Sequence, residues 1–77
     1  MSMATQYRYA MCVKNRGFSF SLDLRKVYRV LPDRAAARHR MLRVIDESGE
    51  DYLYPEEYFQ FVELPRSAIR LFSRKSA

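Results

Sequence analysis

The stretch from Met41 to Leu64, MLRVIDESGEDYLYPEEYFQFVEL, constrains the fold more than any other part of the sequence. Two runs rich in β-branched, aromatic and other apolar residues, 42–46 and 52–54, flank a short polar segment that contains Gly49. Such residues favour strands, and glycine adopts at low cost the left-handed backbone that a three-residue hairpin loop requires. The stretch therefore predicts a tight β-hairpin.

The register of this hairpin predicts which side chains share a face. A loop over 47–49 sets Val44 opposite Tyr52 and Leu42 opposite Tyr54. Because alternate residues of a strand point to opposite faces, these four side chains lie together, and we expect them to be core. The other face is half apolar, so we expect another segment or a partner to cover it. That face carries Arg43, Ile45, Asp51 and Leu53.

Proline, glycine and capping residues divide the rest of the chain into short elements. Pro55 cannot donate a ladder hydrogen bond and ends the second hairpin strand, and residues 56–58 favour a single helical turn. Asp33 is a suitable N-cap for a helical turn over 34–38. This succession predicts an all-β fold, a small and mostly antiparallel β-barrel. We expect its strands near 7–14, 18–22, 26–31, 41–46 and 51–54, with a short sixth strand near 60–64.

Three structural choices stay open on the sequence alone. Either Val27 or Tyr28 faces the interior, depending on the register of their strand. The tail, 66–77, forms either a helix capped by Ser67 or a strand, and in both cases its apolar residues could cover the half-apolar hairpin face. Near the last strand, the residue that faces the interior is Phe59, Phe61 or Leu64.

The composition limits the classes of protein to which this chain can belong. The 77 residues make one domain with a thin core, and six Tyr and five Phe supply large buried area per residue. Cys12 is the only cysteine, so no intramolecular disulfide forms and a reducing cytoplasm is expected. No apolar run approaches the roughly 20 residues of a membrane helix, and the N-terminus lacks the order of a secretory signal. We expect a monomeric cytoplasmic protein.

Several motifs resemble known small barrels. LDLRKVYRVL and YLYPEEYF resemble SH3-type barrels, in the strand that leaves the diverging turn and in the passage from strand to single turn near the end. VKNRGFSFSL, KVYRVLPD and LRVIDESGEDYLYP together resemble a family of short uncharacterised bacterial proteins with an SH3-like barrel. That resemblance covers roughly residues 10–65. It implies an SH3-like fold and brings no established activity with it.

The resemblance to eukaryotic peptide-binding SH3 domains indicates one location for a partner site. Pro55 and Tyr58 occupy the places of the proline and tyrosine of their groove, whereas the tryptophan and the paired aromatic motif are missing. We combine these two residues with the apolar residues of the half-apolar hairpin face. The candidate partner-binding surface is therefore Tyr58, Pro55, Leu53 and Ile45.

Residues that carry catalytic or metal chemistry form no convergent pattern. His39, the only histidine, lies between two arginines in a predicted loop, and nothing nominates a partner to position it as a base. Cys12 is expected to be a small buried hydrophobe. The acidic residues within 46–51 do not match the EF-hand spacing and are expected to be solvated. With no phosphate-binding or dinucleotide glycine motif, we predict no enzymatic activity, no metal and no cofactor.

Charge is strongly segregated along the chain, whose net charge is +5. Residues 1–45 hold ten basic and two acidic side chains, residues 46–63 hold seven acidic ones and no basic one, and the tail adds four basic ones. If folding preserves this separation, the molecule has one basic and one acidic face.

Two function classes follow from these features. The one we favour is protein–protein interaction through aromatic and half-apolar surface, with charges that orient the partner. The alternative is binding of RNA or single-stranded DNA by the basic N-terminal half, with interleaved aromatic rings as stacking platforms. Those rings are Tyr7, Tyr9, Phe18, Phe20 and Tyr28. The candidate nucleic-acid surface is Arg8, Lys14, Arg16, Arg25, Lys26 and Arg29.

Overall fold

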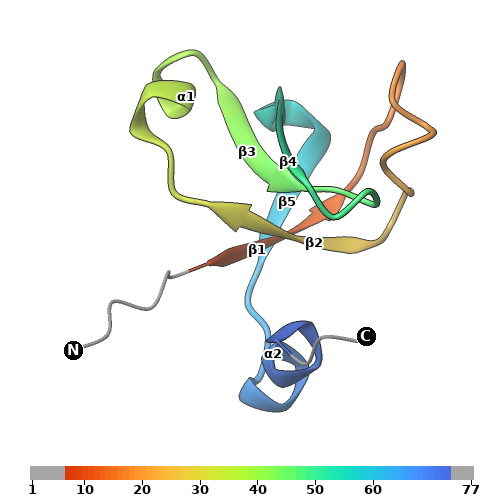
Figure 1. The fold of residues 1–77 in the computed structure, drawn as a ribbon, viewed down its shortest axis with the longest axis vertical. Helices are drawn as coiled ribbons and strands as arrows, with labels where there is room; N and C mark the ends of the chain where they lie inside the picture. The colour runs from red at the N-terminus through yellow and green to blue at the C-terminus, as the bar shows by residue number, and fades with distance from the viewer. Residues whose placement is uncertain (1–6, 74–77) are drawn as a thin grey trace.

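The computed structural model describes residues 7–73, which form one five-stranded antiparallel sheet and two short helices (Figure 1). The hydrogen-bonded order of the strands is β4-β3-β2-β1-β5. The all-β class predicted from the sequence is confirmed. The elements are β1 (Arg8–Cys12), β2 (Val27–Leu31), α1 (Arg34–Arg38), β3 (Met41–Ile45), β4 (Asp51–Pro55), the 3-10 turn η1 (Glu56–Tyr58), β5 (Phe59–Val62) and α2 (Arg66–Ser73).

The sheet is strongly curled, because its two edge strands are consecutive in the chain. Only η1, three residues long, separates β4 from β5. In a flat sheet with strands about 4.8 Å apart the two edges would lie about 19 Å from each other. A three-residue 3-10 turn advances only about 6 Å, so the sheet must bend to bring the edges together. No ladder joins β4 to β5 in the described residues, and the sheet is not closed.

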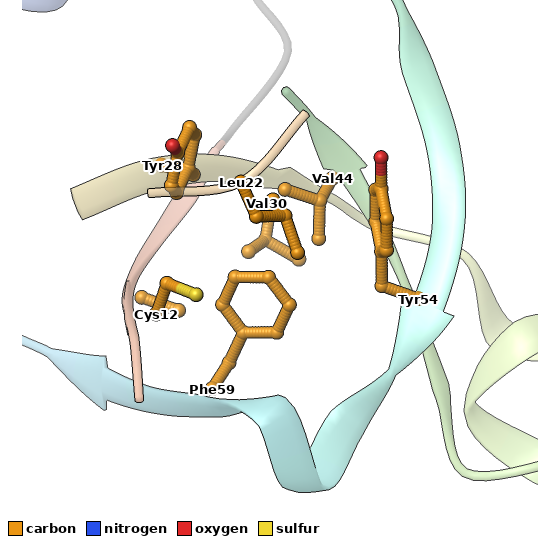
Figure 2. Packing of buried hydrophobic residues seen from close by; sticks show 8 residues of the cluster. Cys12, Leu22, Tyr28, Val30, Val44, Tyr54 and Phe59 are labelled. Carbon is orange, nitrogen blue, oxygen red and sulfur yellow. The ribbon is translucent and has the colours of Figure 1, made fainter. Parts of the chain in front are cut away.

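The inner face of the curled sheet holds the core (Figure 2). Two small residues of β1, Ala10 and Cys12, are fully buried there and leave room for large rings. The Phe59 ring lies edge-on to Tyr28 and to Tyr54, with centroids 6.4 and 6.3 Å apart. Of the open alternatives, Tyr28 and Phe59 therefore occupy the interior. The remaining members of the core are Leu22, Val30 and Val44.

The hairpin is built as its sequence predicts, with one exception. Val44 pairs with Tyr52 and Leu42 with Tyr54, and Gly49 has a φ of +88°. The prediction that Tyr52 belongs to the core is wrong, since the residue is 51% exposed and is not a member of the core cluster. Its hydroxyl donates instead to Glu50, at 3.1 Å.

The left-handed backbone at Gly49 should make replacement of this glycine destabilising. An added Cβ would meet no atom within 4 Å, so only the backbone opposes a side chain at this position. We expect Gly49→Ala to lower the free energy of unfolding by about 1 kcal/mol and Gly49→Asn to lower it less, because asparagine tolerates this conformation better. Urea midpoints of the two variants measure the difference. Equal costs for both variants would contradict the assigned turn.

The side chain of Ser48 also contributes hydrogen bonds to the turn that contains Gly49. Its hydroxyl donates to the Asp46 carboxylate at 2.6 Å and accepts from the Glu50 amide at 3.2 Å. We therefore expect Ser48→Ala to be destabilising as well, because two hydrogen bonds are lost.

The predicted strand over 18–22 is wrong. Phe18 ends a turn in which its amide donates to Asn15, and the Leu22 amide then donates back to the Phe18 carbonyl at 2.9 Å. This helix-like turn places residues 18 and 22 on one side, so Leu22 is buried while Phe20 is 76% exposed. Alternation of apolar residues at 18, 20 and 22 matches a strand, yet the segment joins no strand of the sheet, and the amides of Ser21 and Leu22 both donate to the Phe18 carbonyl.

Both helices follow local signals in the sequence. Asp33 caps α1 as predicted, accepting from the Ala36 amide at 2.9 Å. The tail forms a helix rather than a strand. It begins at Arg66, so Ser67 lies within its first turn and does not cap it, and the Pro65 carbonyl accepts from the Ala68 and Ile69 amides. None of the helices in residues 7–73 has the length and apolar character needed to cross a membrane.

Helix α2 covers part of the outer face of the sheet. Its Phe72 ring lies 5.2 Å from the Tyr9 ring, and Phe72 and Ile45 line one small hollow. The expectation that the tail lies over the half-apolar hairpin face therefore holds for Ile45. Leu53 stays 41% exposed. Arg43, on the same face, is paired with Asp33 and Asp51.

Candidate protein-binding site

The predicted partner-binding residues do not line one common hollow. Pro55 lines a hollow with Met41, and Ile45 lines a different hollow with Phe72; neither hollow is lined by Tyr58 or Leu53. Tyr58 instead packs edge-on to Phe18, with centroids 6.0 Å apart, and its hydroxyl donates to the Arg16 carbonyl. The structure thus assigns Tyr58 to holding the loop between β1 and β2.

A cleft lined by four aromatic residues lies between that loop and the hairpin, and we call it the aromatic cleft. Phe18 and Phe20 come from the loop, and Tyr52 and Tyr54 come from β4. Its volume is about 370 Å³. Phe20 and Tyr52 are the exposed members, whereas Tyr54 is buried beneath them. The remaining lining residues are Ser21, Asp46 and Ser48.

The two sides of the aromatic cleft are fixed to each other by hydrogen bonds. The Glu47 amide donates to the Ser21 carbonyl at 3.1 Å. The hydroxyls of Ser21 and Tyr54 are 2.9 Å apart and hydrogen-bonded. Behind the loop, the Asn15 side chain donates to the carbonyl of buried Leu22. The turn that carries Phe20 is therefore anchored on both sides, and Phe20 is held outward by an ordered segment.

Asp46 forms the polar base of the aromatic cleft and is 6% exposed. One carboxylate oxygen accepts from the Ser48 amide and hydroxyl, at 2.9 and 2.6 Å, and the other accepts from the Tyr54 hydroxyl at 2.5 Å. Burial alone would raise the pKa of Asp46, but these hydrogen bonds outweigh burial and lower the pKa below its ordinary value. Asp46 is therefore ionised near neutral pH.

Within residues 7–73, the charge of Asp46 has no cation as an ion-pair partner. The described residues form ion pairs between Lys26 and Glu47, and between Arg43 and both Asp33 and Asp51, so Asp46 takes part in none of them. Its partners are neutral donors. Glu50, at the rim, also has no cationic partner in this part of the chain, and it accepts from the Tyr52 hydroxyl.

The six residues of the candidate nucleic-acid surface are spread over several places. Arg8 lies over the Phe61 ring at 3.9 Å, Arg29 over Tyr7 at 5.0 Å and Lys14 over Tyr58 at 5.9 Å. Each of these rings thus has one face occupied by a cation of the protein itself. Lys26 lies over Tyr28 and pairs with Glu47. The loop between β1 and β2 carries Lys14, Arg16, Arg25 and Lys26.

The remaining residues with reactive side chains are Cys12 and His39. Cys12 is fully buried, and burial raises the pKa of its thiol, which donates a hydrogen bond to the Lys14 carbonyl. His39 is exposed just after α1. Within residues 7–73, no three histidine, cysteine or acidic side chains are grouped so that they could hold a metal ion.

Three carboxyl groups make the stability of the fold depend on pH. Their pKa values are lowered in the folded state: Asp33 by the Ala36 amide and Arg43, Glu47 by Lys26 and Tyr28, and Asp46 as described. The unfolded chain, with ordinary carboxyl pKa values of about 4, binds protons first as the pH falls. We expect the free energy of unfolding to be level near neutral pH and to decrease below about pH 5. Urea unfolding at several pH values tests this, and an increase on acidification would contradict it.

Sequence reasoning missed the aromatic cleft because it assigned each part of the cleft to another role. The sequence pattern predicts Phe20 on a strand, Tyr52 in the core and Asp46 at a solvated hairpin tip. One local signal was present, because aspartate two residues before Ser48 favours an Asx-turn that directs the carboxylate back onto the chain. Comparison with protein families, curated proteins and solved structures found no match to this chain.

Proposed function

We propose that this protein is a non-catalytic interaction module that binds a segment of another protein in the aromatic cleft. The observation that carries the proposal is Phe20, which is 76% exposed although its turn is anchored by hydrogen bonds and by buried Leu22. Aromatic rings held rigidly at a surface offer large contact area at small entropic cost, and such residues dominate the energy of protein interfaces.

The arrangement of Tyr52 supports the same function. It lies across the aromatic cleft from Phe20, half exposed, with its hydroxyl directed to Glu50 at the rim. A pair of exposed rings with polar groups at the edge and base matches the usual composition of an interface, an apolar centre inside a polar rim.

We further infer that the curled sheet is an SH3-like small barrel. Its support is the position of η1, which joins the two edge strands within three residues, together with the motifs YLYPEEYF and LDLRKVYRVL. In this arrangement the aromatic cleft uses the long loop after β1 and the hairpin between β3 and β4. It is separate from the hollow that Pro55 lines.

Nucleic-acid binding remains the alternative and has weaker support. Two of the rings expected to stack on bases are covered by candidate cations, Tyr7 by Arg29 and Tyr28 by Lys26. Arg8 and Lys14 lie over other rings of the protein, and Lys26 is also paired with Glu47. The exposed rings of the aromatic cleft adjoin Asp46 and Glu50, whose charges would repel phosphate.

Selection from a library of displayed random peptides tests the proposal. We expect the unaltered protein to enrich related peptides whose binding is lost in the double variant Phe20→Ala, Tyr52→Ala. Leu71→Ala is the matched control, because Leu71 is an apolar side chain 69% exposed on α2, outside the aromatic cleft. Circular dichroism establishes that all variants are folded. Enrichment that is unchanged in the double variant, or no enrichment at all, would contradict the proposal.

A salt series with single-stranded RNA tests the alternative. We expect only weak binding at physiological salt, abolished by a competitor polyanion. Submicromolar affinity that survives the competitor would favour nucleic-acid binding over the protein-binding proposal.

A further inference from the structure

The acidic residues of the hairpin tip divide into two pairs. Glu47 and Asp51 each have an internal cation, Lys26 and Arg43 respectively. Asp46 and Glu50 have none among the described residues. Asp46 lines the aromatic cleft, and Glu50 accepts a hydrogen bond from Tyr52, which also lines it. The carboxylates without an internal cation therefore lie where a ligand would bind.

Asp46 has remaining capacity to accept a hydrogen bond. An ionised carboxylate offers about four acceptor positions, and Ser48 and Tyr54 together use three of those of Asp46. A buried carboxylate held by neutral donors keeps its full charge, and in a site shielded from water that charge attracts a cation more strongly than an exposed one does.

The walls of the aromatic cleft suit the same ligand. Phe20 and Tyr52 expose ring surface, and a cation over an aromatic face is attracted by the ring's negative charge distribution. The protein makes such contacts elsewhere, with the Arg8 guanidinium 3.9 Å from the centre of the Phe61 ring. Arginine fits better than lysine, because its planar group stacks on rings and is less strongly hydrated.

We infer that the aromatic cleft binds an arginine side chain of a basic protein segment, with the guanidinium between Phe20 and Tyr52 and directed at Asp46. This inference rests on the proposed function and adds the chemical class of the partner to it. An apolar peptide, a second copy of this chain or a nucleic acid are then outcomes of the test.

The test uses two short peptides, acetyl-Gly-Arg-Gly-amide and the same peptide with citrulline, the neutral analogue of arginine. Binding is followed by amide chemical shifts in ¹H–¹⁵N spectra of the full chain. We expect the arginine peptide to shift residues of the aromatic cleft, and the citrulline peptide to bind at least about tenfold more weakly, since it keeps the shape and loses the charge.

Variants of single acidic residues identify which negative charge contributes to binding of the arginine peptide. We expect Asp46→Asn and Glu50→Gln each to weaken binding of the arginine peptide. Glu56→Gln, an exposed acid on η1 with the same change of net charge, should leave it unaltered. If Asp46→Asn does not fold, two other measurements test the role of charge. These are the binding of the arginine peptide by Glu50→Gln and the weakening by salt of its binding to the unaltered protein. Phe20→Ala should weaken binding in a folded protein.

The outcomes separate this inference from the proposed function. Equal binding of the arginine and citrulline peptides, or equal effects of Glu50→Gln and Glu56→Gln, would overturn the inference. In that case, selected peptides that still require Phe20 and Tyr52 would leave the protein-binding function standing. If no displayed peptide is enriched and the arginine peptide shifts nothing in the aromatic cleft, both are overturned. Shifts that appear only as the protein concentration rises would identify a second copy as the occupant and contradict the inference.

Discussion

Leu22→Ala is expected to lower the free energy of unfolding by about 3 kcal/mol, the usual cost of emptying a fully buried leucine site. Leu22 belongs to no helix or strand, but it is fully buried in the same cluster as Val44 and Phe59. Since small domains have a total stability of about 5–15 kcal/mol, this one substitution would remove a large part of it. Urea unfolding followed by circular dichroism measures the change.

The neighbouring Phe20 is the matched control for Leu22. Phe20 is larger and equally apolar, but it is 76% exposed, so Phe20→Ala should change the stability by less than about 0.5 kcal/mol. The contrast between the two variants tests the helix-like turn over 18–22, in which these residues point in opposite directions. Similar costs for both would mean that the loop is not packed on the core in the way described.

Removal of the Asp46 side chain is expected to have the second largest effect on stability. Asp46→Ala deprives the Tyr54 hydroxyl and the Ser48 amide of their acceptor. The Tyr54 hydroxyl keeps only Ser21 as a partner, and because a hydrogen bond to a charged group contributes about 1.5–3 kcal/mol, we expect a loss of about 2–3 kcal/mol. Asp46→Asn retains an acceptor oxygen and should cost less.

The same pair of variants has a distinct dependence on pH. Since the pKa of Asp46 is lowered by folding, its ionised form stabilises the native state at neutral pH and loses this effect as the pH falls through the folded pKa. The stability difference between the unaltered protein and Asp46→Asn should therefore shrink on acidification. A difference that stays constant from neutral pH to acid would show that Asp46 acts only through its shape.

Elements that depend on neighbouring residues could be predicted from the sequence. The hairpin register follows from Gly49, which needs no partner elsewhere to adopt a left-handed backbone. Asp33 caps α1 through an amide three residues away, and Pro55 ends a strand because it lacks an N–H. In each case the signal and its effect lie within a few residues, so they can be read without the fold.

The aromatic cleft could not be predicted in this way, because its geometry is set by contacts between distant residues. The apolar pattern at 18, 20 and 22 fits a strand and a helix-like turn equally, and only the packing of Leu22 against the curled sheet selects the turn. Ser21 and Tyr54 are 33 residues apart, and their hydrogen bond joins the loop to the hairpin. The sequence determined the sheet and its hairpin through local backbone preferences. Tertiary packing decided which rings face solvent and which carboxylate lies beneath them without a cationic partner among residues 7–73, because burial depends on which distant segments pack together.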